Sequence, residues 1–277
     1  VNFDGITYAK GGSVLKQLVA WVGLESFMKG VAAYFRKHQF GNTELSDLLT
    51  ELEAASGRDL GEWSRLWLET AGVNTLRPEI TTADDGTIES FAILQSAAAS
   101  HPTIRPHRLA VGFYTLTDDG LSRTHRVELD VAGERTDVPE LVGLARPDLA
   151  LLNDDDLAYA KIRLDDVSRA TAVEHLAEIT DPLARALVWG SFWDATRDGE
   201  VPASEFVRLV VNNIPSETAW TTLRTTLGQV VLAARSYVAP ARRTQTLEAV
   251  ADALWAFAQS ADPASDAQFQ FVKFFAQ

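Results

Sequence analysis

Residues 1–15 read VNFDGITYAKGGSVL, and they combine a tyrosine with the beginning of a helical pattern. From Lys10 onward, apolar residues recur at helical spacing and stop at a glycine. The stripe consists of Val14, Leu15, Leu18, Val19 and Val22, and it ends at Gly23. This pattern places Tyr8 at the N-terminus of a helix. Backbone N–H groups without a helical partner make that end positive, so a phenol there suits donation to a developing oxyanion. The alternative is a tyrosine that packs its ring under the helix and leaves its hydroxyl in water.

Further helical stripes follow as far as Ala71. They consist of Phe27, Met28, Val31, Tyr34 and Phe35, then Leu45, Leu48, Leu49 and Leu52, then Trp63, Leu66 and Trp67. We expect Asn42 or Thr43 to cap the second of these helices and Gly57 to end it. Asp59 and Glu62 have the spacing of a capping box for the third, and Gly72 closes the helical block.

The hydrophobic period changes to two near Leu76. Leu109, Val111 and Phe113 alternate with other residues, as do Val127, Leu129 and Val131, which is typical of strands. Asp85-Gly86 and Asp119-Gly120 suit the positive φ angles of tight hairpins. Short strands at this spacing, as far as about Leu164, predict a small β-sandwich.

Helical spacing returns at Asp166 and continues to the last residue. Asp181-Pro182 is a cap followed by a proline in the first turn, and Gly199 is a helix stop. The helices recur about every twenty residues, which predicts stacked helical pairs of the solenoid kind.

Composition excludes several classes of function. The net charge is −13, which repels phosphate backbones and anionic lipids, so we expect neither nucleic acid nor membrane as a partner. The chain has no cysteine, which removes disulfides, thiolate nucleophiles and cysteine-bound zinc. No apolar run reaches the length of a membrane span and no leader pattern opens the chain, so a cytoplasmic location is expected. The only methionine is Met28, and we expect the chain to be a piece of a longer protein.

The first fifteen residues resemble the catalytic-tyrosine segment of the M1 family of zinc aminopeptidases, whose pattern is F-D-x-I-x-Y-x-K-G-x-x-V-L. The matching residues are Phe3, Asp4, Ile6, Tyr8, Lys10, Gly11, Val14 and Leu15. A second, weaker likeness joins Trp63, Trp67, Leu68 and Thr70-Ala71-Gly72 to W-x-x-x-W-L-x-T-x-G, at the close of the family's catalytic domain.

The resemblance implies an α+β multidomain fold: the helical end of a thermolysin-like catalytic domain over residues 1–75, a β-sandwich over 76–165, and part of an α-helical, HEAT-like array over 166–277. It implies that Tyr8 donates a hydrogen bond to the tetrahedral intermediate while zinc polarises the same oxygen. It also implies that Phe3 lines the pocket for the substrate's first side chain, although a core aromatic is an equal alternative. The zinc ligands and the general base of the family precede this segment, so the parent enzyme would hold zinc and this chain alone would be inactive.

Other metal sites find little support in the sequence. None of the five histidines, His38, His101, His107, His125 and His175, begins an H-E-x-x-H pattern, and no two are four residues apart. The run from Asn153 to Asp156 lacks the glycine and the distal glutamate of an EF-hand, and a polar turn explains it better.

These observations predict the C-terminal portion of a zinc-dependent aminopeptidase that removes N-terminal residues from peptides. This portion would supply Tyr8 and part of the chamber wall. The alternative is a noncatalytic, M1-like scaffold for protein interactions.

Overall fold

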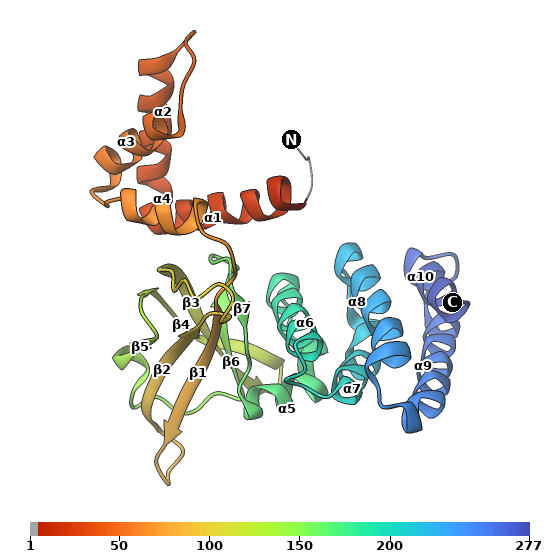
Figure 1. Ribbon diagram of the computed structural model, residues 1–277. Coiled ribbons are helices and arrows are strands. Elements are labelled where there is room, and N and C mark those ends of the chain that lie inside the picture. Colours follow the sequence, from red (N-terminus) through yellow and green to blue (C-terminus); the bar gives the residue numbers. More distant parts are fainter. Residues whose placement is uncertain (1–4) are drawn as a thin grey trace. The chain divides into compact units, whose positions relative to one another are not determined.

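The computed structural model describes residues 5–277, and within them the chain is a mixed α+β protein (Figure 1). The helices are α1 (Gly11–Val22), α2 (Leu24–His38), α3 (Leu45–Ser56), α4 (Gly61–Leu68), α5 (Asp166–His175), α6 (Pro182–Arg197), α7 (Ala203–Asn213), α8 (Trp220–Leu232), α9 (Pro240–Ser260) and α10 (Asp266–Phe275). The strands are β1 (Thr75–Thr82), β2 (Ile88–Ser96), β3 (His107–Thr117), β4 (Gly120–Val131), β5 (Arg135–Asp137), β6 (Leu149–Asp154) and β7 (Lys161–Ile162). Helices, strands and helices thus follow one another as predicted, which confirms the α+β class.

The chain forms two compact units. Unit 1 comprises residues 1–111, 126–146 and 152–162, and unit 2 comprises residues 112–125, 147–151 and 163–277. Three strands, β3, β4 and β6, contribute residues to both units. The three-domain division at residues 75 and 165 stays a prediction.

The helical part of unit 1 is built around a small apolar core. Val14, Leu18 and Val22 of α1 pack with Leu52 and with Trp63 and Trp67 of α4. Gly23, at φ +83°, ends α1, and Gly57, at φ +72°, ends α3, as predicted.

Two predicted helix caps are wrong. The α3 helix is capped by Glu44, whose side chain forms a reciprocal capping box with Asp47, and neither Asn42 nor Thr43 takes that place. At α4 the capping box of Asp59 and Glu62 is absent, because Glu62 pairs with Arg65 one turn further along at 2.6 Å. At α3 several suitable side chains compete for one set of backbone N–H groups, whereas at α4 the Glu62 carboxylate is engaged by an arginine.

The strands form two sheets. One has the order β5-β2-β1-β7, and in it β1 and β2 are an antiparallel hairpin while β7 runs parallel to β1. The other has the order β4-β3-β6. Gly86, at φ +83°, lies in the β1–β2 turn, and Gly120, at φ +101°, is the first residue of β4 directly after the β3–β4 turn, so both have the positive φ that was predicted. Every residue from Leu109 to Tyr114 is buried, so the period of two does not separate a wet face from a dry face in β3.

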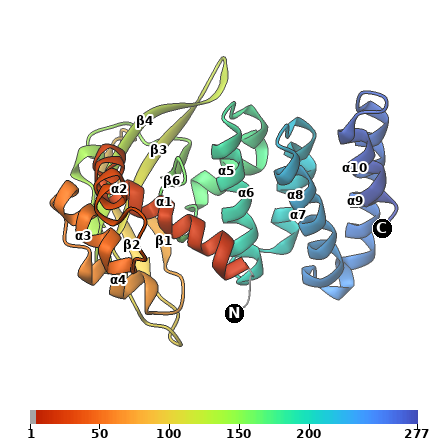
Figure 2. The same ribbon diagram turned by 90° about the horizontal axis from the view of Figure 1, so that it is seen from above.

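Unit 2 contains a row of paired helices. Figures 1 and 2 show α5 to α10 in successive pairs, with α9 beside α10 and α7 beside α8. Asp181 caps α6 by accepting from the Leu183 amide, Pro182 takes the first helical position, and Gly199 follows the helix at φ +79°. These local signals were all predicted.

No single helix among the described residues is long and apolar enough to cross a membrane. The helices Ile6–Val22 and Leu24–His38 satisfy that length and composition only as a pair, and they are bent by 108° at the break between them.

Candidate functional site

Tyr8 lies in the first helical turn that the structure describes. Residues Ile6–Lys10 form a π-helical turn, in which the Gly11 N–H reaches back to the Ile6 carbonyl, and this turn continues into α1 without a break. The helix therefore begins about one turn earlier than its apolar stripe indicates. Tyr8 is 66% exposed, so its ring is not packed beneath the helix. Single π-turns of this kind occur frequently at functional sites.

A groove of about 550 Å³ borders Tyr8. Helix α1 and the turn before it contribute Tyr8 and Lys10, and the opposite sides come from α3 and α4. The remaining lining is mostly apolar and includes Leu15, Leu18, Leu45, Leu48, Leu49, Trp63, Trp67 and Leu68. The fold thus brings together the tyrosine segment and the Trp63–Leu68 segment, which are more than fifty residues apart in the sequence.

Phe3, the predicted pocket residue, lies outside the described residues. The same holds for Asp4, the motif residue before Gly5.

The residues described here do not fit a zinc ion. Among residues 5–277, no group of three His, Cys, Asp or Glu side chains lies in a position to hold a metal. The histidines have other contacts: His107 is buried against the ring of Trp67 and its Nε2 is 2.8 Å from Gln95 Oε1. Burial, followed by the nearby charge of Arg105, lowers the pKa of His107 to about 3. A neutral, buried imidazole of this kind serves the core of the protein.

The run from Asn153 to Asp156 contains the last two residues of β6 and the turn that follows it, so the predicted polar turn covers only Asp155 and Asp156 of the run. Asn153, Asp155 and Asp156 all have positive φ angles, which such residues tolerate in turns. Asp155 pairs with Arg126 at 2.6 Å and Asp156 with Lys16 at 2.9 Å. These carboxylates are thus used for ion pairs within unit 1.

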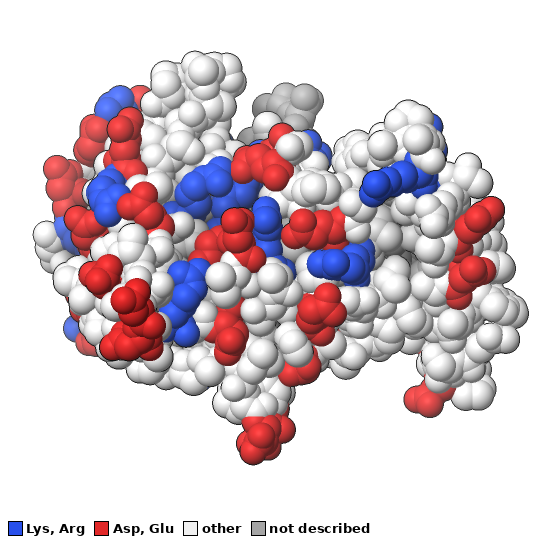
Figure 3. Space-filling view, turned by 90° about the horizontal axis from the view of Figure 1, so that it is seen from below, with Lys and Arg blue, Asp and Glu red and all other residues white. Residues whose placement is uncertain are grey.

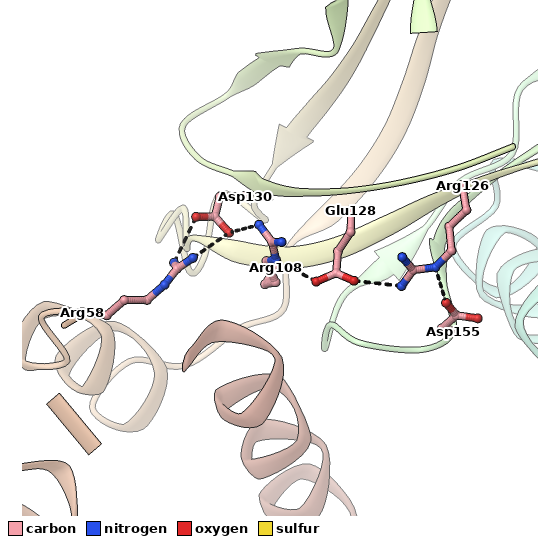
Figure 4. A network of polar contacts seen from close by, with 6 residues as sticks. All are labelled: Arg58, Arg108, Arg126, Glu128, Asp130 and Asp155. Carbon is pink, nitrogen blue, oxygen red and sulfur yellow. Dashed lines mark hydrogen bonds and ion pairs between the residues drawn. The ribbon is translucent and has the colours of Figure 1, made fainter. Parts of the chain in front are cut away.

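A chain of ion pairs that sequence reasoning missed runs through unit 1 (Figure 4). Its members, in order, are Arg58, Asp130, Arg108, Glu128, Arg126 and Asp155, with contacts between 2.6 and 3.0 Å. Burial acts to raise the pKa of Glu128, but hydrogen bonds from Arg126 and Arg108 outweigh it, so this pKa lies below its ordinary value. The strand pattern of Val127, Leu129 and Val131 implies that Glu128 and Asp130 share the opposite face of the strand. No local signal in the sequence predicts which arginines pair with them.

Acidic and basic side chains are interspersed on the face that Figure 3 draws, with clusters of blue between clusters of red. Among the ion pairs the two signs also alternate, since Arg135 of β5 contacts both Glu79 and Asp137.

Comparison with known proteins assigns the family. Residues 1–69 match the family model described as "Peptidase family M1 domain", and residues 149–277 match "ERAP1-like C-terminal domain". The chain is 54% identical to aminopeptidase N of Streptomyces lividans over 283 aligned residues, which cover all of this chain and 33% of that protein. It is 43% identical to aminopeptidase N of Lactococcus lactis over 79 residues, or 28% of this chain and 9% of that protein. The chain belongs to the M1 aminopeptidase family and is aminopeptidase N-like.

A solved structure agrees with the fold. The crystal structure of Legionella pneumophila aminopeptidase A in complex with aspartic acid superposes with a TM-score of 0.55 at 13% identity, over 99% of this chain and 34% of that one. The chain therefore spans about a third of the length of both the Streptomyces relative and this structure.

Proposed function

We propose that this chain is part of a zinc-dependent aminopeptidase that removes N-terminal residues from peptides, and that Tyr8 stabilises the transition state of that hydrolysis. One observation carries the proposal: the tyrosine of the family motif is exposed at an apolar groove whose other wall contains the second motif segment. The identity to aminopeptidase N of Streptomyces lividans along the whole chain supports it.

The chemistry assigned to this chain rests on the Tyr8 hydroxyl. When a peptide carbonyl is attacked, its oxygen gains negative charge, and a positioned phenol stabilises that charge by donating a hydrogen bond. The apolar side chains of the lining, including Leu15 and Leu68, offer no polar group that competes for that bond. Phe3 would line the pocket for the substrate's first side chain.

Zinc belongs to the complete enzyme in this proposal. Because residues 5–277 offer no set of ligands, the metal and the general base would come from the rest of the protein, and this chain alone would hold no zinc and hydrolyse no peptide. The proposed layout is a catalytic-domain end at residues 1–75, a β-sandwich at 76–165 and a HEAT-like array at 166–277. We propose a peptide substrate as the partner of the complete enzyme, and neither nucleic acid nor a membrane. We also propose a cytoplasmic location.

The test is Tyr8→Phe in the complete enzyme. This substitution keeps the ring and removes one hydrogen bond that forms as charge develops, so kcat should fall by about 10²–10³ while KM barely changes. Tyr34→Phe is the control, because Tyr34 also lies on a helix of unit 1, is not among the residues that line the groove, and has its hydroxyl 2.6 Å from that of Thr43. It should leave kcat unchanged.

Zinc content and melting temperature of each variant establish that the enzyme is intact. A Tyr8→Phe enzyme that keeps its zinc and its wild-type kcat would remove the role of Tyr8. A complete protein without any aminopeptidase activity would instead favour the noncatalytic scaffold.

A further inference from the structure

Tyr8 lies in the π-helical turn that continues into α1, and α1 carries one buried polar residue, Gln17, that the apolar core does not require. Gln17 is fully buried beside Val14 and Leu18, which belong to the apolar core. Its Nε2 has no hydrogen-bond partner among the described residues. An unsatisfied buried amide costs about 1–3 kcal/mol, so an apolar side chain would pack here at lower cost. The other end of the amide explains why a glutamine is present.

Gln17 Oε1 accepts a hydrogen bond from the backbone N–H of Tyr159, at 2.9 Å. Tyr159 follows the turn after β6, more than 140 residues later in the sequence. Next to Gln17, Lys16 pairs with Asp156 of the same turn at 2.9 Å. Two consecutive residues of α1 therefore bind one short segment, residues 153–159.

That segment is itself held rigidly. Asn153 closes it on both sides, since its Oδ1 accepts from the Ala158 N–H at 2.7 Å and its Nδ2 donates to the Ala158 carbonyl at 2.9 Å. Asp155 is fixed by Arg126, at one end of the chain of ion pairs in Figure 4. At the other end of that chain, the Arg58 guanidinium lies 4.3 Å above the ring of Trp21, again on α1. The network thus returns to α1 at a second point.

The segment also reaches the turn that contains Tyr8. An open depression of about 420 Å³ is lined by Tyr159 together with Ile6, Ala9 and Ser13. Tyr159 therefore lies alongside the first turns of the helix as well as binding Gln17.

We propose that residues 153–159, acting through Gln17, are a positioning element that fixes the direction of α1 and so places the Tyr8 hydroxyl. This inference rests on the proposed role of Tyr8. Gln17 does not contact the reacting atoms itself, and it acts on Tyr8 through the helix. Gln17 is nine positions along the chain from Tyr8, a helical rise of about 14 Å, so a tilt of about 5° at Gln17 displaces Tyr8 by about 1 Å. A displacement of that size is sufficient to lower a rate by about 10².

The experiment uses four forms of the complete enzyme: wild type, Gln17→Met, Tyr8→Phe and the double variant. Methionine keeps the length and volume of glutamine but cannot accept the Tyr159 hydrogen bond. We expect Gln17→Met to lower kcat at least about tenfold with KM within about twofold, and to have no further effect in the Tyr8→Phe background, because both changes remove the same hydrogen bond to the transition state.

Gln95→Met is the matched control. Gln95 is also buried, but its amide binds the Gly133 carbonyl and His107, and it has no hydrogen bond to α1. This variant should lower the melting temperature and leave kcat unchanged. If Gln17→Met does not fold, Gln17→Asn keeps the amide but withdraws it by one methylene and should show the same pattern.

The outcomes are distinct. If Tyr8→Phe lowers kcat but Gln17→Met does not, or if Gln17→Met lowers kcat equally in both backgrounds, the positioning role is wrong. If Tyr8→Phe itself has no effect on kcat, the proposed catalytic role of Tyr8 is wrong, and the positioning role that rests on it is wrong as well.

Discussion

Glu217→Gln removes one charge from a deeply buried ion pair in unit 2. Arg185 and Glu217 have side chains that are 7% and 1% exposed, and the Arg185 guanidinium donates to both carboxylate oxygens at 3.0 and 3.2 Å. The same carboxylate accepts from the Trp189 indole at 3.1 Å and from the Ala219 amide at 2.9 Å. Four donors thus depend on one carboxylate that connects α6 to the segment before α8.

The expected loss follows from this burial. Removing one partner of a buried pair costs about 3–5 kcal/mol, since the other charge is left uncompensated. Glutamine keeps the volume and one acceptor oxygen, so about 3 kcal/mol is expected. For a unit of about 130 residues, an unfolding entropy of roughly 0.27 kcal/mol/K converts this loss into a fall of about 10 °C in Tm.

The effect should depend on pH. Burial acts to raise the pKa of Glu217, but hydrogen bonds from Arg185, the Ala219 amide and Trp189 outweigh it, and its pKa is lowered from 4.5. The stability that this carboxylate contributes is therefore complete above about pH 4.5 and is lost as the pH falls through the lower, folded value. The difference between wild type and Glu217→Gln should shrink in that range.

Thermal unfolding followed by circular dichroism at pH 7 and at acidic pH measures this effect. Asp194→Asn, which breaks the exposed pair with Arg197 on the same helix α6, should change the free energy of unfolding by less than about 0.5 kcal/mol. A Glu217→Gln protein that melts within about 2 °C of wild type at pH 7 would refute the reasoning.

Two other predictions concern packing and pH. Gly30→Ala should destabilise the protein by at least about 1 kcal/mol in urea unfolding, because a Cβ at Gly30 of α2 would lie 2.9 Å from the Glu51 carbonyl oxygen and 3.0 Å from Leu52 Cα of α3. Gly190→Ala, on the exposed side of α6 with nothing within 4 Å of the new Cβ, should stabilise it by about 0.5–1 kcal/mol, and equal effects of the two would contradict this. His107 has a folded pKa of about 3, below the value of 6.5 expected when unfolded, so the unfolded state binds its proton more readily and stability falls below about pH 6.5. Between pH 6.5 and pH 5 this group alone should cost up to about 2 kcal/mol, and a His107→Gln variant with an unchanged slope of stability against pH would show that another group is responsible.

The sequence determined the order and type of the elements. Helix ends at Gly23, Gly57 and Gly199 and the cap at Asp181-Pro182 were predicted because each is a local conformational preference of one or two residues. Tyr8 was singled out in the same way, from a short motif, and its catalytic role stays a proposal. Where several side chains competed for one helix end, as at Glu44, the sequence alone did not decide, because the difference among capping residues is small.

The tertiary structure decided which distant residues meet. It placed Trp63 and Trp67 at the groove beside Tyr8, and it joined Gln17 to Tyr159 and Arg185 to Glu217. Such pairs leave no periodic signal, since any of the 38 acidic side chains is a chemically suitable partner for an arginine. Only the packing of the apolar core fixes which two charges or amides share one buried space, and for that reason the groove and its supports could be located only in the folded chain.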